Sequence, residues 1–519
     1  MSSQMLQSAR LVGVLTLMSR LLGLARDMAI TATLGVGTGA SAFWTAFQVP
    51  NLFRRLFGEG ALSAASIPVL TETLSKDGAA AADRLAGRIL GLLLVLLAGL
   101  IVVGEAVIAG LYWRYGGQEK NALVLTLAGL MLPYMLFICA AAMLGGVQNV
   151  FGRFASAAAA PIILNLFMIA AALAGPFMTP AEKRQVVLLA AAVVVSGVFQ
   201  LAWQWAAARR LGLRLPLSLD TRDPTLRRIA VTMLPMILGL ATVQLNTFAD
   251  SLIAWWFVPE KVLRPGGAAE EVGPAVLSLA QRLYQFPLAI FASALATAIF
   301  PALSRHAAEN DLPGLARTLS RGLRVTSFEG LPSMVGLILV REPLVALLFG
   351  RGRFQDWPEA TQRVSFALFM YALGIWAFGV NQIVVRAYYA VGDPRTPLGV
   401  SVRNVALNLA LGLLLVHTAL KEAGLALATS ICAVVQVVVL LRRLSPRVGR
   451  LEWRAIGTAM LRTAAATAIM AGGVLAVDRF LPAHSAAVRV GAMVVTGGLV
   501  FLASAWLLRC PEIKELARR

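Results

Sequence analysis

The sequence predicts an all-α protein that crosses a membrane many times. Of its 519 residues, 58% are hydrophobic and 14% are charged, whereas soluble domains carry about 25% charged residues. The mean hydropathy is +0.76. The apolar segments are long and continuous, as in ILGLLLVLLAGLIVVGEAVIAGLYW (89–113). About 20 such residues span the hydrocarbon core as a helix, whereas strands of a membrane barrel are about ten residues long and alternate.

These apolar segments predict about 14 transmembrane helices. The second, eighth and tenth segments are too long for simple spans, so we expect them to bend, tilt or extend beyond the bilayer. In chain order the expected spans are 10–34, 38–72, 84–113, 122–149, 156–177, 185–208, 229–258, 273–304, 318–340, 360–390, 396–418, 422–441, 455–477 and 486–508.

Arginine and lysine gather in the connections that follow even-numbered spans and at the C-terminus. Cytoplasmic connections carry such an excess, so we expect these connections and both termini to be cytoplasmic. Topology and attraction to anionic lipid head groups then explain much of the net charge of +20, and nucleic-acid binding has no place in the interpretation. The residues are Arg209, Arg210, Arg214, Arg222, Arg227, Arg228, Arg305, Arg317, Arg321, Arg324, Arg442, Arg443, Arg447, Arg450, Arg454, Lys514, Arg518 and Arg519.

Two pairs of segments indicate an internal repeat. ALSAASIPVLT (61–71) is similar to ALATAIFPALS (294–304), and PIILNL (161–166) is similar to RNVALNL (403–409). The two copies are separated by six spans, an even number, so they have the same orientation, as in transporters built from parallel repeats. We expect two parallel six-helix repeats and two C-terminal helices with a cytoplasmic tail, divided as 1–225, 226–445 and 446–519.

Charged residues also lie inside the first, second and eighth expected spans. An arginine at the bilayer centre costs at least about 2.5–3.5 kcal/mol. Arg20 and Asp27 are seven residues apart and share a helix face within about 20°. Arg55 and Glu59 have the spacing of an ion pair within a helix. The full set is Arg20, Arg26, Asp27, Arg54, Arg55, Glu59 and Arg282.

Two interpretations of these arginines stay open. In the first, they reach an interface or satisfy helix ends. In the second, they line a water-filled cationic cavity between the repeats, which would hold a phosphate group, because a guanidinium stays charged and binds oxyanions through two parallel hydrogen bonds. The three cysteines, Cys139, Cys432 and Cys510, form no metal-binding pattern, and we expect them to be small core residues.

Four motifs identify a resemblance over nearly the whole chain. SRLLGLARD (19–27), AFWTAFQVPNLFRRLFGEGALSAASIPVL (42–70), QRLYQFPLAIFASALATAIFP (281–301) and GDPRTP (392–397) resemble the MurJ/MviN lipid II flippases, part of a superfamily that includes multidrug and polysaccharide exporters. The resemblance implies substrate-binding roles for Arg20, Arg26, Asp27, Arg54, Glu59 and Arg282.

The sequence departs from the family at two positions. Many members carry aspartate where this chain has Ser41, and some carry glutamate where it has Gln285. We expect transport to stay measurable after Ser41→Asp or Gln285→Glu, because members of the family accommodate these acids. The resemblance also implies that the last two helices form a groove for a lipid tail.

The implied function is a bacterial inner-membrane transporter, not an enzyme. It would move the undecaprenyl-pyrophosphate-linked peptidoglycan precursor from the inner to the outer leaflet by alternating access. Its partners would be lipid II, membrane lipids and cell-wall synthesis machinery. No cofactor is expected, and no nucleotide-binding motif is visible, so coupling to the membrane potential or an ion gradient is expected. The alternatives are an exporter of another lipid-linked oligosaccharide and an intramembrane glycosyltransferase.

Overall fold

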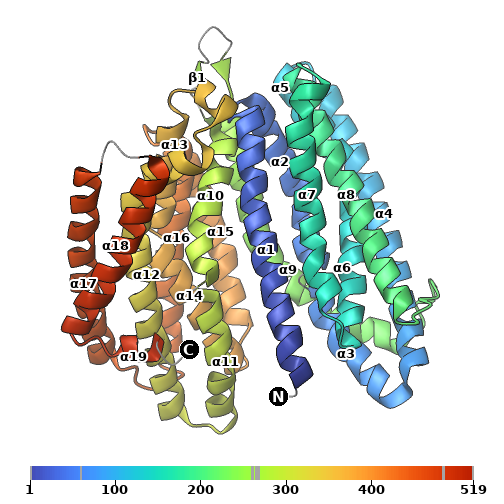
Figure 1. The fold of residues 1–519 in the computed structure, drawn as a ribbon. Helices are drawn as coiled ribbons and strands as arrows, with labels where there is room; N and C mark the ends of the chain where they lie inside the picture. Colours follow the sequence, from blue (N-terminus) through green and yellow to red (C-terminus); the bar gives the residue numbers. More distant parts are fainter. Residues whose placement is uncertain are drawn as a thin grey trace. The chain divides into compact units, whose positions relative to one another are not determined.

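A computed structural model describes residues 3–58, 61–258, 262–263, 269–290, 292–481 and 485–516 of the chain. They are almost entirely helical (Figure 1). The chain divides into two compact units. Unit 1 contains Met1–Ala249, Glu270–Val272 and Gly352–Asp356, and unit 2 contains Asp250–Ala269, Gly273–Arg351 and Trp357–Arg519. The three-part division expected from the repeat stays a prediction.

Unit 1 is a bundle in which α1 packs on α7, α7 and α6 pack on α8, and α2 packs on α5 (Figure 1). Residues through Ala249 of α9 also belong to this unit. Its elements are α1 (Ser3–Leu34), α2 (Thr38–Phe53), the π-helix η1 (Arg54–Gly58), α3 (Ala61–Asp77), α4 (Ala79–Tyr115), α5 (Glu119–Met131), α6 (Tyr134–Val150), α7 (Ala155–Met178), α8 (Glu182–Arg210) and α9 (Pro224–Phe257).

Unit 2 is a second helical bundle, in which α15 packs on α16 and α17 and α18 pack on each other and on α12. Two short strands, β1 (Val262–Leu263) and β2 (Ala269–Glu270), pair between α9 and α10. The remaining elements are α10 (Gly273–Ile290), α11 (Ala292–Ala308), α12 (Leu312–Phe349), the 3-10 helix η2 (Gly352–Asp356, in unit 1), α13 (Ala360–Ala372), α14 (Ile375–Ala390), α15 (Arg395–Val416), α16 (Glu422–Leu444), α17 (Trp453–Phe480), α18 (Ala486–Leu507) and α19 (Glu512–Leu516).

The fold is the all-α membrane bundle predicted from the sequence, with β1 and β2 as a small exception. Every expected span overlaps a helix or a pair of helices. The second, eighth and tenth spans, which were expected to be irregular, are each divided into two α-helices. Among the described residues, nine helices are long and apolar enough to cross a membrane, or ten if α13 and α14, bent by 40°, form one span.

The bend between α13 and α14 has a local chemical cause. Ser430 of α16 donates from its hydroxyl to the carbonyls of Met370 and Tyr371, at 2.6 and 3.3 Å. These bonds satisfy backbone acceptors beside the break, which would otherwise be costly in a membrane. A β-carbon at Gly374 would lie 2.8 Å from Ser430 Oγ and from Phe378 Cε2, so the close approach requires glycine.

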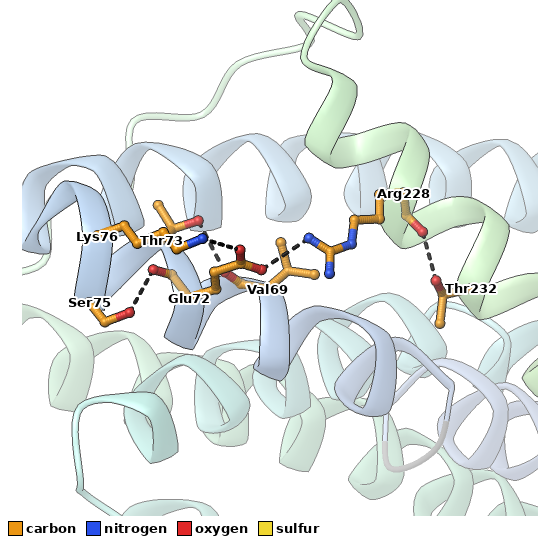
Figure 2. Close-up of polar contacts among 7 residues, drawn as sticks. All are labelled: Val69, Glu72, Thr73, Ser75, Lys76, Arg228 and Thr232. Carbon is orange, nitrogen blue, oxygen red and sulfur yellow. Dashed lines mark hydrogen bonds and ion pairs between the residues drawn. The ribbon is translucent and has the colours of Figure 1, made fainter.

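Carboxylates pair with some of the basic residues near the ends of the helices. Figure 2 shows Glu72 of α3 between Lys76 of the same helix and Arg228 of α9, with N–O distances of 2.8 and 3.0 Å. Exposed ion pairs of this kind stabilise a protein little. They do offset positive charge locally, so the number of arginines overstates the field at this surface.

The connection between α8 and α9 lies against α4. The carboxylate of Asp83 accepts hydrogen bonds from the backbone nitrogens of Arg214 and Leu215, at 3.0 and 2.9 Å. A β-carbon at Gly87 would lie 2.3 Å from the carbonyl oxygen of Pro216. Because that neighbour is backbone, a larger residue at Gly87 would displace the connection.

The buried side chains of α17 and α18 join unit 2 through α12. Met470 of α17 and Phe501 of α18 belong to one apolar cluster with Phe328 of α12, and the rings of Phe328 and Phe501 are 5.0 Å apart. Cys510 belongs to the same cluster. All three cysteines of the chain are buried and none is in a disulfide, in agreement with their expected role as small core residues.

Candidate functional site

Arg26 and Asp27 form a buried ion pair in α1. Their exposed fractions are 6% and 2%. Arg26 donates to Asp27 Oδ1 from Nε at 3.0 Å and from Nη2 at 2.6 Å. A buried arginine needs such a partner, because an unpaired charge removed from water is strongly destabilising. Adjacent residues therefore neutralise each other here, although they point to neighbouring faces of a regular helix.

Arg26 also connects α1 to its neighbours. Its Nη1 donates to Asn165 Oδ1 of α7 at 3.1 Å, and Asn165 Nδ2 in turn donates to the carbonyl of Ser19 at 3.0 Å. The guanidinium carbon lies 5.7 Å from the centre of the Trp44 ring of α2, within the range of a cation–π interaction. This arginine thus connects three helices in the described conformation, and both interpretations stay predictions.

Asn165 was not singled out as a site residue by the sequence analysis. It is 5% exposed and lies inside the apolar segment PIILNL that supported the repeat. A lone amide inside an expected span is a signal for a polar partner on another helix. The partner itself is 139 residues away in sequence.

Arg20 and Arg54 are more accessible than Arg26. Arg20 is exposed on α1, and Arg54 is half-buried at the start of η1. Arg54 donates to Asn51 Oδ1 from Nε and Nη2, at 3.1 and 2.8 Å. The neighbouring Arg55 donates from Nη1 to Gln244 Oε1 of α9 at 2.9 Å.

Two predicted site residues are not brought into this group by the structure. Glu59 lies outside the described residues, so its expected pair with Arg55 is untested. Arg282 is half-buried on α10 and belongs to unit 2, whereas the other predicted arginines belong to unit 1. Convergence of all four arginines on one ligand stays a prediction.

Unit 1 contains a cavity of about 310 Å³. Its wall comes from η1, α3, α6, α7 and α8. Small residues such as Ala141, Gly145, Gly146 and Ala160 leave the space open. The polar residues that line it are Arg54, Ser63, Tyr134, Asn149, Gln200 and Gln204. One cation and several neutral amides and hydroxyls suit a polar ligand without a positive charge.

Unit 2 contains a buried carboxylate that the sequence analysis also left out. Asp250 of α9 is 2% exposed. Thr429 of α16 donates to its Oδ2 at 3.4 Å, and Asn408 of α15 donates to Thr429 Oγ1 at 3.1 Å. Its place inside the expected span 229–258 was the available signal, because an ionisable residue at membrane depth is by default a functional candidate.

The chain is similar to proteins of one family over most of its length. Residues 30–491 match the family described as "Lipid II flippase MurJ". A probable lipid II flippase MurJ of Rhizobium meliloti strain 1021 is 33% identical over 481 residues, which cover 90% of this chain and 86% of the relative. The corresponding protein of Vibrio cholerae serotype O1 is 31% identical over 455 residues, which cover 85% and 83%.

A solved structure shares the fold. The structure titled "Lipid II flippase MurJ, inward closed conformation" superimposes with a TM-score of 0.76, covering 96% of this chain and 98% of the other, at 21% sequence identity. At that identity the likeness concerns the fold alone. It agrees with the helical architecture read from the apolar segments.

Proposed function

Because this chain belongs to the family of MurJ lipid II flippases, we propose that it moves lipid II from the inner to the outer leaflet. The protein is a multi-pass membrane transporter, not an enzyme. Three parts of this proposal go beyond family membership: the direction of transport, a cycle of alternating access and a cationic cavity. The cationic cavity has support in particular residues.

The observation that carries the proposal is the presence of arginines on α1 and η1 of unit 1, inside the first and second expected spans. Arg20 is exposed and Arg54 lines the polar cavity. Guanidinium groups bind diphosphate oxygens through paired hydrogen bonds and stay charged at physiological pH. We propose that they hold the diphosphate while the polyprenyl tail stays in lipid. Arg282 of unit 2 is a further predicted ligand of the diphosphate.

Arg26 and Asp27 have a combined role in this proposal. Three of the five N–H groups of Arg26 are used by Asp27 and Asn165. The remaining two N–H groups would face the diphosphate, while Asp27 and Asn165 hold the guanidinium in place. Glu59, by its position after η1 in sequence, would balance the charge of the arginines beside it.

The cycle would draw its energy from the membrane potential or an ion gradient. Moving one elementary charge through 100 mV is worth about 2.3 kcal/mol. We propose that the protein lies in the bacterial inner membrane with both termini in the cytoplasm, beside the cell-wall synthesis machinery. An impermeant reagent should then fail to label a tag after Arg519 in intact cells, and labelling would refute this orientation.

Replacement of the resident flippase tests the function itself. We expect the chain to restore growth of a bacterium depleted of that flippase and to restore exposure of lipid II at the outer surface. An Arg20→Ala variant of equal abundance should lose both. Restored export of another lipid-linked oligosaccharide without exposure of lipid II would favour the exporter alternative.

A further inference from the structure

Gln200 of α8 is a buried amide with no hydrogen-bond partner among the described residues. It is 1% exposed and lines the cavity of unit 1. Within the described part of the chain, neither its Nε2 nor its Oε1 has a hydrogen-bond partner. Leaving a buried polar group unsatisfied is costly, and native proteins rarely do so without a reason. The amide therefore offers a donor and an acceptor to a group that enters the cavity.

The same wall offers further groups to such a ligand. The Oδ1 atom of Asn149 is also without a partner, and Ser63 and Tyr134 bring hydroxyls to the wall. Asn149 belongs to α6 and Ser63 to α3. Donors and acceptors thus come from three helices, as in a binding site with a defined ligand orientation.

Loose packing of this part of the bundle does not explain Gln200. Gln204, one turn further along α8, lines the same cavity and is fully engaged. Its Oε1 accepts from Gln148 Nε2 at 2.9 Å and from Ser156 Oγ at 2.8 Å, and its Nε2 donates to the carbonyl of Ser156 at 2.9 Å. The local structure satisfies one glutamine and leaves its neighbour open.

The corresponding helices of unit 2 are packed differently. The predicted repeat relates α3, α6, α7 and α8 of unit 1 to α11, α14, α15 and α16 of unit 2, in that order. The four helices of unit 2 share an apolar core that includes Ile299, Val384 and Val437. Gln436 of α16 is paired, because it donates to Ser401 Oγ at 3.0 Å and accepts from Asn404 Nδ2 at 3.1 Å. The corresponding helices of unit 2 thus share an apolar core and a paired glutamine.

We propose that this cavity binds the sugar attached to the diphosphate of the transported lipid, an inference that rests on the proposed function. The lining holds amides and hydroxyls, which suit the hydroxyl and acetamido groups of a sugar. Arg54 on the same wall would contact the diphosphate, to which that sugar is bonded. A volume of about 310 Å³ is at the small end of ligand sites, which measure about 300–1,000 Å³, and fits part of the head group.

Binding by the full-length protein in detergent tests the proposal. The three probes are undecaprenyl diphosphate, the same lipid carrying the disaccharide without peptide, and lipid II. The wild-type protein should prefer both sugar-bearing lipids, and Gln200→Leu should weaken their binding about tenfold, since it removes two hydrogen bonds. Binding of undecaprenyl diphosphate should not change. Gln436→Leu should leave the preference for sugar-bearing lipids intact.

Thermal unfolding separates a ligand group from a structural one. Without lipid, Gln200→Leu should unfold at the wild-type temperature or above it, because an apolar side chain replaces an unsatisfied amide. Gln204→Leu should unfold at a lower temperature, because Ser156 loses both of its contacts with the Gln204 side chain and Gln148 keeps only its bond to the Gln204 carbonyl. Unfolding of Gln200→Leu at the lower temperature of Gln204→Leu would overturn the inference.

Each binding outcome leads to a separate conclusion. Equal binding of all three lipids by the wild-type protein and by Gln200→Leu would overturn the sugar site and leave the flippase function standing. A preference that appears only when the peptide is present would overturn the assignment to the sugar. Binding of none of the three lipids would overturn the proposed function and this inference with it.

Discussion

Replacement of Arg26 by lysine separates the charge of this residue from its geometry. Lysine keeps the positive charge but has one nitrogen in place of the guanidinium fork. It can remain paired with Asp27, whereas the bond from Nη1 to Asn165 Oδ1, 3.1 Å long in the native protein, would be lost. A hydrogen bond to a charged group contributes about 1.5–3 kcal/mol, so Arg26→Lys should lower the free energy of unfolding by about that amount.

A larger loss is expected when the charge itself is removed. Arg26→Met leaves Asp27, which is 2% exposed, without its counterion. Breaking a buried pair in this way costs about 3–5 kcal/mol. Arg210→Lys is the matched control, because Arg210 is exposed at the end of α8 and its replacement keeps the charge. The control should unfold like the wild-type protein.

A double-mutant cycle with Asn165→Leu measures the contact directly. Unfolding of the four purified proteins in detergent should give a coupling energy of about 1–3 kcal/mol between Arg26→Lys and Asn165→Leu, since residues in one hydrogen-bond network are not additive. Additive effects would show that the Arg26–Asn165 contact contributes nothing. Growth of a flippase-depleted strain should fall with Arg26→Lys at equal protein abundance, and undiminished growth would refute the role of its paired hydrogen bonds in binding.

Two further predictions concern single carboxylates. Asp393 lies outside the membrane spans and accepts two hydrogen bonds from Thr396, one from its hydroxyl at 2.6 Å and one from its backbone nitrogen at 3.0 Å. The hydroxyl is the largest cause that lowers the pKa of Asp393 below its ordinary value of 3.8. This stabilisation is present above pH 3.8 and is lost as the pH falls through the lower folded value. Asp393→Ala should therefore cost about 0.5–1.5 kcal/mol at neutral pH, as for loss of a hydrogen bond, and should make the stability depend less on pH below neutrality. An unchanged profile would contradict this. Ser41 is 0% exposed, so Ser41→Asp should lower the unfolding temperature strongly. Gln285 is half-buried, so Gln285→Glu should change the unfolding temperature little. Equal effects of the two substitutions in the same melting assay would show that burial does not decide how well an acidic residue is accommodated.

The sequence by itself determined the architecture. Length and hydropathy of each apolar segment decide whether it spans a bilayer, and these properties belong to the segment alone. The excess length of the second, eighth and tenth segments likewise indicated that they are irregular. Family membership was also evident from local motifs such as PNLFRRLFGEGALS, which keep their order along the chain.

Only the tertiary structure decided what the polar residues contact. Arg26 carries the same charge whether it faces water or Asn165, and the identity of a partner 139 residues away depends on how α1 and α7 pack. Gln200 and Gln204 are the same residue type one turn apart on α8, yet the structure satisfies one and leaves the other open to a cavity. Hydrogen bonds act over about 3 Å, so distances between helices select the partners, and those distances are set by packing of the whole bundle.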